Sequence, residues 1–359
     1  MKSEDHYRID SHKLHLHPRR LADWQEGKNI APIYIEISPS GACNHRCRFC
    51  GTDFMGYKVR FLPTDILYVR LREMGKAGVK AIMYAGEGEP FLHKDMGKIA
   101  QATKQAGIDV AFTTNAVALR EQTWREILPV TSWLKVSCNA GTAQTYGHIH
   151  GTVPADFDKV LANMEQGVEL RKQLDSKCTL GFQIVLLPEN QNEVIGLAEK
   201  ARSLGVDYLV VKPYSHHPQS ETAEYAGIMY EESFEAIARE LQTLNTDTFN
   251  TIFRTRALQR WQCREKTYSR CLALPFWSYI DAAGEMWGCS MFLGDPRFAY
   301  GNIVKQSFMD IWQGQARRDS LVWCAEHLDT TQCRVNCRME NLNTYLWELT
   351  SPGPHANFI

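Results

Sequence analysis

The chain has 359 residues, a formal net charge of −1 and a sequence pI of about 6.9, so its overall charge gives no reason to expect nucleic acid or an anionic membrane as a partner. No apolar run approaches the roughly 18 residues of a membrane span, and the first six residues lack the apolar core of a secretory signal. Eleven cysteines without an export signal favour a reducing, cytoplasmic location and metal ligation over disulfide bonds.

Strand-like and helical segments alternate through the first two thirds of the chain. The predicted strands are residues 33–38, 81–84, 110–114, 134–138, 181–187 and 208–212. The clearest predicted helices are residues 65–77, 95–106 and 156–174. Such alternation predicts an α/β fold with parallel strands joined by right-handed crossovers, either a partial barrel or an open doubly wound sheet. In both folds, functional residues lie at the carboxyl ends of the strands.

Three cysteines follow the first predicted strand in a short polar loop, with the spacing C-x-x-x-C-x-x-C: Cys43, Cys47 and Cys50. Thiolates are the ligands that iron–sulfur clusters select, and a cubane cluster has four irons. Three thiolates would bind three irons and leave the fourth open to a small molecule. Zinc is the alternative, but it prefers four ligands and only His45 could complete this loop. The loop therefore predicts a reactive iron–sulfur centre.

This loop, with Phe49 directly before its last cysteine, resembles that of the radical S-adenosylmethionine (radical SAM) enzymes. The resemblance implies a partial (β/α)6 TIM-like barrel and a [4Fe–4S] cluster whose open iron binds SAM. It also implies that reductive cleavage of SAM gives a 5′-deoxyadenosyl radical, which removes a hydrogen atom from the substrate. Reduced flavodoxin or ferredoxin would supply the electron.

Segments at the ends of later strands extend the resemblance. Glu87-Gly88-Glu89-Pro90 resembles the family's Gly-Gly-Glu-Pro segment, with Glu87 where glycine is usual. By the resemblance, Glu89 and the backbone around Gly88 would bind the amino group of SAM. Thr114-Asn115-Ala116 resembles the family's Thr-Asn-Gly. The residues implied as SAM contacts are Phe49, Glu87, Gly88, Glu89, Asn115, Ser137 and Asn139.

The fourth predicted strand places Lys135, Ser137 and Asn139 on one face, which should line the barrel. Ser137 and Asn139 could bind the ribose or carboxylate of SAM there. The family more often has aspartate at position 139 and arginine where this chain has His150. Cys138 points the other way and is expected to be a buried structural thiol.

The end of the sixth predicted strand offers candidate catalytic residues. Lys212 and Tyr214 would face the substrate, and a base able to deprotonate a radical intermediate would be useful there. A solvated polar loop is the alternative interpretation.

Six further cysteines lie in the C-terminal third. The pattern Cys271-x12-Gly284-x4-Cys289 resembles the SPASM and twitch extensions of radical SAM enzymes, which bind auxiliary clusters. The ligands implied for one auxiliary [4Fe–4S] cluster are Cys263, Cys271, Cys289 and Cys337.

A second auxiliary cluster is an open alternative. It would use Cys324, His327 and Cys333 with an unidentified fourth ligand, because His327 stands where the family pattern has cysteine. Loss of that site would leave Cys324 and Cys333 as free thiols.

The resemblance divides the chain into five parts. They are an N-terminal extension (1–30), a radical SAM partial barrel (31–225), a helical linker (226–260), a small cysteine-rich SPASM/twitch-like domain (261–345) and a C-terminal tail (346–359). The short extension leaves no room for the leader-binding domain that peptide-modifying members often carry, which favours a small substrate.

The sequence therefore predicts an oxidoreductase that acts on a small hydroxylated molecule, such as a sugar or aminocyclitol, with help from the auxiliary cluster. Peptide modification and epimerisation are alternatives within the family. A non-catalytic metal-binding or electron-transfer protein is the alternative from another class.

Overall fold

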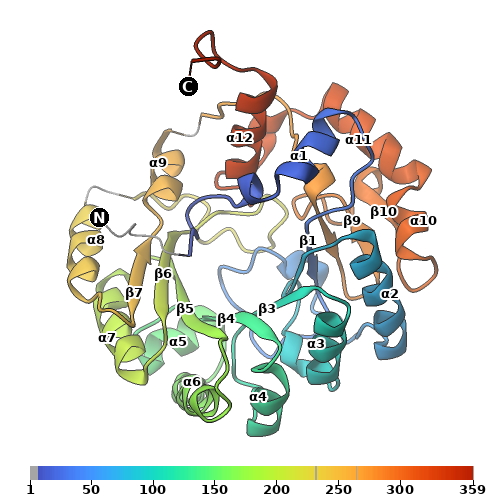
Figure 1. Cartoon of the computed structure of the whole chain (residues 1–359). Helices are drawn as coiled ribbons and strands as arrows, with labels where there is room; N and C mark the ends of the chain where they lie inside the picture. The colour runs from blue at the N-terminus through green and yellow to red at the C-terminus, as the bar shows by residue number, and fades with distance from the viewer. Residues whose placement is uncertain (1–6, 231–232, 264, 359) are drawn as a thin grey trace.

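The computed structural model describes residues 7–230, 233–263 and 265–358, and its centre is one ten-stranded sheet (Figure 1). The strand order is β10-β9-β8-β1-β2-β3-β4-β5-β6-β7. In this order, all neighbouring strands between β8 and β7 pair in parallel. Strand β9 pairs antiparallel with both β8 and β10. The strands are β1 Tyr34–Ile37, β2 Ala81–Tyr84, β3 Asp109–Thr114, β4 Thr131–Ser137, β5 Thr179–Leu186, β6 Tyr208–Pro213, β7 Asn250–Phe253, β8 Trp277–Ile280, β9 Glu285–Trp287 and β10 Ala299–Asn302.

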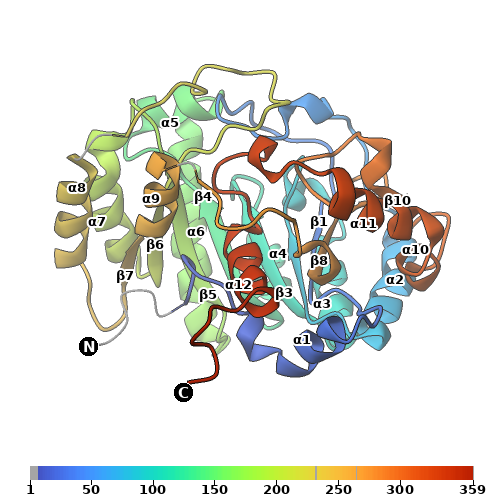
Figure 2. The same ribbon diagram turned by 90° about the horizontal axis from the view of Figure 1, so that it is seen from above.

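Helices cover the outer side of the curved sheet, so that β1 to β7 form a partial TIM-like barrel (Figures 1 and 2). The helices are α1 Pro18–Gln25, α2 Thr64–Ala77, α3 Met96–Gln105, α4 Glu121–Ile127, α5 Ala143–His150, α6 Ala155–Gln173, α7 Val194–Leu204, α8 Ser233–Thr243, α9 Thr255–Cys263, α10 Phe308–Trp312, α11 Gln315–His327 and α12 Glu340–Thr350. Among the described residues, no helix combines the length and apolar character that a membrane span requires.

The hydrophobic core lies between the sheet and these helices, and strand β4 shows how the sequence produces it. Leu134, Val136 and Cys138 are fully buried toward the helices, whereas Lys135 and Ser137 are half-buried on the opposite, inner face. Burial of a large apolar side chain contributes about 1.5–3 kcal/mol. The alternation expected for this strand is confirmed, as is the buried position of Cys138.

The region expected to be a helical linker contains a strand, and this corrects the expectation for residues 226–260. The segment Asn250–Phe253 forms β7 between α8 and α9 and pairs in parallel with β6 from Tyr208 to Val211. The barrel therefore has a seventh strand. Only four residues form it, too few for a clear alternating pattern.

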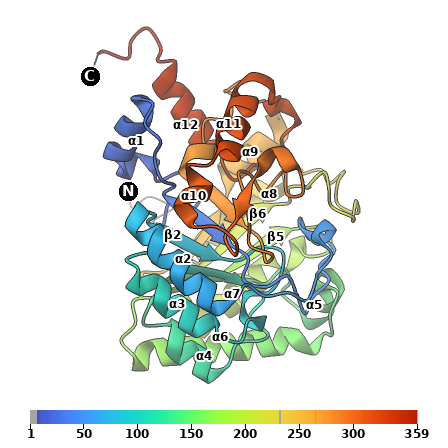
Figure 3. The same cartoon turned by 90° about the vertical axis from the view of Figure 1, so that its right-hand side faces the viewer.

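The N-terminal extension packs against the C-terminal domain (Figure 3), and Arg20 also donates a 3.1 Å hydrogen bond to the carbonyl of Gly78 at the end of α2. Leu14, Leu21 and Ile30 share one apolar cluster with Trp277 on β8. The indole Nε1 of Trp312 donates a 2.7 Å hydrogen bond to the carbonyl of Ile30. Segments from the two ends of the chain thus stabilise each other.

Replacement of Trp312 by Phe should destabilise the fold more than replacement of Trp124 by Phe. Both indoles are fully buried, but only the Trp312 Nε1 has a hydrogen-bond acceptor among the described residues, whereas the Trp124 Nε1 has none. Loss of the Trp312 donor leaves the Ile30 carbonyl unpaired, which costs about 1–3 kcal/mol. Urea denaturation of the two variants measures the difference, and equal free energies of unfolding would contradict it.

Candidate functional site

The cysteine loop lies at the carboxyl end of β1, where α5 holds it in place. The backbone N–H groups of Arg46 and Arg48 donate to the carbonyls of His150 and Ile149, at 3.0 and 2.9 Å. Burial raises the pKa of the Cys47 thiol well above its usual value, and the nearby Cys50 and Cys43 raise it further. The three thiols are therefore close enough to interact electrostatically, and all three residues are half-buried.

The spread of these three sulfur atoms suits a cluster better than a single ion. No group of metal-binding atoms within 4.8 Å of one another, among the described residues, contains Cys43, Cys47 and Cys50 together. Sulfur atoms that bind one zinc ion, with Zn–S bonds of about 2.3 Å, lie less than 4.8 Å from one another. The donor set, three thiols on one short loop, fits a [4Fe–4S] cluster with one open iron.

Two histidines flank Cys47. The Nδ1 atom of His150 lies 3.3 Å from the Cys47 sulfur, and its Nε2 accepts a 3.2 Å hydrogen bond from the backbone N–H of Asn139. Because Nε2 accepts, the proton is on Nδ1 and His150 donates to the sulfur. Burial lowers the pKa of both imidazoles, that of His45 to about 4, so both are neutral.

The segment after β2 is built to lie against the cysteine loop. A Cβ atom on Gly88 would come within 2.3 Å of the Ser40 carbonyl and 2.4 Å of the Ala42 carbonyl, so only glycine fits. The carboxylate of Glu89 accepts hydrogen bonds from Thr114 Oγ1, from the N–H of Asn115 and from that of Phe91, at 2.6, 2.8 and 3.1 Å. Glu89 therefore orders the ends of β2 and β3, and its contact with SAM stays a prediction.

Glu87 replaces a family glycine, and the structure gives the reason. Its carboxylate pairs with Arg60 at 3.1 Å and accepts a 2.9 Å hydrogen bond from the N–H of Ala282, which follows β8. Glu87 thus ties the SAM-site loop to the C-terminal domain. Its contact with SAM stays a prediction.

The other implied SAM contacts divide into two kinds. Asn115 donates a 2.7 Å hydrogen bond to Asn44 inside the cysteine loop, and Phe49 of the same loop is half-buried, with its ring 5.5 Å from that of His150. Ser137 is half-buried at the end of β4, and the roles of these three residues stay predictions. Asn139 is fully buried, and its Oδ1 accepts from the N–H of Val185 at 2.7 Å. Its amide supports the fold, and its contact with SAM stays a prediction.

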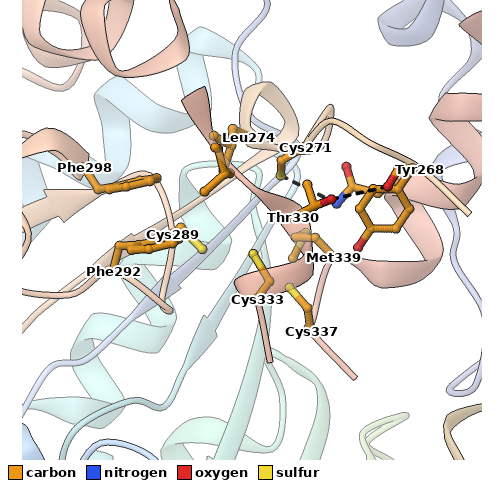
Figure 4. Close-up of a pocket in the computed structure, with 12 residues that line it drawn as sticks. Tyr268, Cys271, Leu274, Cys289, Phe292, Phe298, Thr330, Cys333, Cys337 and Met339 are labelled. Carbon is orange, nitrogen blue, oxygen red and sulfur yellow. Dashed lines mark hydrogen bonds between the residues drawn. The ribbon is translucent and has the colours of Figure 1, made fainter. Parts of the chain in front are cut away.

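Four cysteines line a second cavity, in the C-terminal domain (Figure 4): Cys271, Cys289, Cys333 and Cys337. Burial raises the pKa of all four thiols, to about 11 for Cys271 and about 12 for Cys333. Asn343 Nδ2 lies 3.6 Å from the Cys271 sulfur and holds it in place. Within the described ranges, these four sulfurs also form no group compact enough for a single ion. Four thiols around one cavity fit an auxiliary [4Fe–4S] cluster.

The structure differs from the expected ligand set at one position. Cys263 is exposed on the last turn of α9 and is not among the residues that line the cavity, whereas Cys333 is. The second expected cluster stays a prediction, because the charge of Cys333, in addition to burial, still acts on the Cys324 thiol and raises its pKa. Cys324 is buried in α11, and His327 is exposed and stacks on Trp323 at a ring distance of 5.9 Å.

A loop of residues 333–338, which we call the bridging loop, joins the two cysteine sites. Its carbonyl at Val335 accepts a hydrogen bond from Ser215 in the loop after β6. Arg338 forms an ion pair with Glu36 on β1 and donates to the Tyr34 hydroxyl at 3.0 Å. The bridging loop therefore carries two of the cavity cysteines on one side and reaches the barrel on the other.

The two candidate catalytic residues differ in position. Lys212 is half-buried on the inner face of β6, whereas Tyr214 is buried and its hydroxyl lies 3.2 Å from Nδ1 of His216. Sequence reasoning missed Asp53, whose carboxylate accepts from Ser220 Oγ at 2.9 Å and so fastens the loop after β6 onto the cysteine loop. It also missed Arg334 and Arg338 of the bridging loop. Each directly follows a cysteine, Cys333 or Cys337, and this position was the one signal in the sequence that could have indicated them.

Comparisons with known proteins agree with both cysteine sites. Residues 37–201 match the radical SAM superfamily model, and residues 271–338 match that of the SPASM iron–sulfur cluster-binding domain. An AdoMet-dependent heme synthase from Methanosarcina barkeri is 26% identical over 302 residues, 79% of this chain and 82% of that protein. A tungsten-containing aldehyde ferredoxin oxidoreductase cofactor-modifying protein from Pyrococcus furiosus is 26% identical over 50% of each chain.

Solved structures share the fold. Streptococcus suis SuiB bound to S-adenosylmethionine superposes with a TM-score of 0.61 at 20% identity, covering 84% of this chain and 70% of SuiB. Native anSMEcpe with bound AdoMet superposes with a TM-score of 0.53 at 14% identity, covering 82% of this chain and 84% of anSMEcpe. With the two matching family models, these findings show that the chain is a radical SAM enzyme with a SPASM-type domain, whose cofactors are S-adenosylmethionine and [4Fe–4S] clusters.

Proposed function

We propose that this enzyme is an oxidoreductase that removes a hydrogen atom from a small substrate held between the cysteine loop and the auxiliary cavity. The observation that carries the proposal is the bridging loop, which lines that cavity through Cys333 and Cys337 and contacts the barrel through Arg338. A group bound between them would lie near both clusters. The relative matched over 82% of its length is named as a synthase of heme, which supports a small molecule over a peptide.

The cluster held by Cys43, Cys47 and Cys50 would supply the electron that cleaves SAM to the radical that takes the hydrogen. The chain's own residues then have three tasks. Glu89 and the backbone around Gly88 would bind the SAM amino group, and hydrogen bonds from Thr114 and Asn115 hold the Glu89 carboxylate in place. His150 would stabilise charge on Cys47.

The remaining task is to keep water away from the cysteine loop, and the loop after β6 would do this. Ser220 Oγ donates to the carbonyl of Cys50 at 2.9 Å, and Thr222 Oγ1 donates to that of Arg48 at 2.8 Å. These contacts hold the loop after β6 against the cysteine loop. Excluding water protects a reactive intermediate from side reactions.

An auxiliary cluster would supply an electron acceptor beside the substrate, so that loss of one electron and one proton after hydrogen removal completes a two-electron oxidation. We propose Cys271, Cys289, Cys333 and Cys337 as its ligands, since these thiols line one cavity. Four protein thiolates leave no open iron for SAM. Sugars, aminocyclitols and peptides stay alternatives for the substrate, and epimerisation stays an alternative outcome.

The function is tested by adding SAM and dithionite to the anaerobically reconstituted protein. Wild-type protein should release 5′-deoxyadenosine, and the variant with Ala at Cys43, Cys47 and Cys50 should release none, because no iron is left to bind SAM. Liquid chromatography measures the product. A wild-type protein that has its full iron content and makes no 5′-deoxyadenosine would overturn the proposal and favour a metal-binding or electron-transfer protein.

The ligand set is tested by iron and sulfide analysis of single variants. Wild-type protein should hold about eight irons, for two cubane clusters. Cys333→Ala should lose up to about four of them, while the matched control Cys263→Ala should keep the full content. Loss of iron only from Cys263→Ala would show that the exposed cysteine is the ligand. About twelve irons in wild type would instead indicate a second auxiliary cluster.

Replacement of His150 by Leu should lower the reduction potential of the SAM cluster. A hydrogen bond to a thiolate sulfur stabilises the reduced, more negative cluster, and His150 supplies one to Cys47. An EPR-monitored redox titration, following the signal that changes on addition of SAM, measures this potential. His148→Leu is the control, because His148 lies on the same helix and is exposed. Equal potentials in both variants would contradict the role of His150.

A further inference from the structure

Two lysines on the inner face of the barrel have no acidic partner. Lys135 of β4 and Lys212 of β6 are both half-buried near the carboxyl ends of their strands. No carboxylate within the described part of the chain lies within 4.0 Å of either ammonium group. The ammonium nitrogen of Lys135 lies 5.6 Å from the centroid of the Trp133 ring. This end of a parallel barrel is where ligands bind.

A third cation reaches the same region from the bridging loop. Arg334 follows Cys333, and its Nη1 would lie 3.6 Å from a Cβ atom on Gly51, the residue after Cys50. Its Nε is buried and has no hydrogen-bond partner among the described residues. Since a guanidinium is always charged, this unpaired donor calls for an acceptor.

Two other cations of this region are paired. Arg254 pairs with Asp10 at 3.1 Å, and Arg338 forms an ion pair with Glu36. The carboxylate of Asp53, near the cysteine loop, accepts hydrogen bonds from the N–H groups of Glu221 and Thr222 and keeps its negative charge. Among the described residues, none of the three cations Lys135, Lys212 and Arg334 has an ion-pair partner within 4.0 Å.

Burial and the neighbouring positive charges both lower the pKa values of the two lysines. Burial, together with the charge of Arg254, lowers the pKa of Lys135 to about 8. Burial lowers the pKa of Lys212 well below its usual value, and the charges of Lys135, Arg254 and Arg334 lower it further. Without a counter-ion, these buried lysines lose their protons more readily, and an anion bound among them would favour the charged ammonium form.

We propose that the substrate carries an oxyanion, either a carboxylate or a phosphate, which binds to Lys135, Lys212 and Arg334. This inference rests on the proposed function, because it takes the inner face as the substrate site. Arg334 lies next to Gly51, the residue after Cys50 of the cysteine loop. Cys333, the residue before Arg334, lines the auxiliary cavity. A bound anion would thus fix the substrate between the two clusters. A cationic aminocyclitol does not fit this face.

Isothermal titration calorimetry of the reconstituted holoenzyme with SAM tests the proposal. The probes are glycerol 2-phosphate for phosphate, glutarate for carboxylate and glycerol as the neutral counterpart. At least one anion should bind while glycerol does not, and the tighter anion identifies the oxyanion. Because hydrogen bonds to charged groups are worth about 1.5–3 kcal/mol, Lys135→Gln and Lys212→Gln should each weaken binding by roughly tenfold or more.

Two variants control for charge and for general effects. Lys212→Arg keeps the charge and should restore most of the anion binding lost in Lys212→Gln. Lys177→Gln removes a lysine whose side chain is 85% exposed, and it should bind the anion like wild type. The inference is overturned if neither anion binds, if glycerol binds equally well, or if Lys135→Gln and Lys212→Gln behave like Lys177→Gln. Release of 5′-deoxyadenosine by the wild type is a separate readout, so failure of the proposed function would be seen independently.

Discussion

The parallel pairing of β8 with β1 is the constraint on which the geometry of both cysteine sites depends. Beyond the strand pairs themselves, the N–H of Ile33 donates to the Phe276 carbonyl and that of Ser38 donates to the Ile280 carbonyl, at 2.9 and 2.8 Å. The C-terminal domain therefore continues the barrel sheet and cannot turn relative to it. The bridging loop takes its position from this attachment, and with it Arg334 and Arg338 enter the barrel. Electron transfer and substrate binding both require such a fixed arrangement.

The sequence predicted the barrel well because its strands are apolar, regular and separated by clear helix signals. All six expected strands exist, and the segment 81–84 has the expected bounds. The missed strand β7 has four residues, and its place is set by pairing with β6, which is a tertiary effect. The cysteine loop was predictable since all three ligands are local in the sequence.

The auxiliary site was less predictable because its cysteines come from distant segments. Spacing shows which cysteines are available but not which ones the fold brings together. Thus the family pattern implied Cys263, whereas the cavity is lined by Cys333. The same limit applies to Glu87 and Asn139: their side chains have partners, Ala282 and Val185, that only the folded chain places beside them. The sequence placed Lys135 and Lys212 on the inner face of the barrel, but Arg334 was missed because its position depends on how the bridging loop folds back toward the barrel.

The packing of the N-terminal extension on the C-terminal domain has a consequence for how the protein is made. Leu14 and Leu21 leave the ribosome first, yet the apolar cluster that buries them includes Trp277 and Phe298. At about 5–20 residues per second, roughly 15–60 s pass between the synthesis of the two groups. During this time the extension exposes apolar side chains and β1 lacks its partner β8. Contacts of such high sequence separation form slowly. We therefore expect folding to finish only after translation, with the iron–sulfur clusters inserted afterwards.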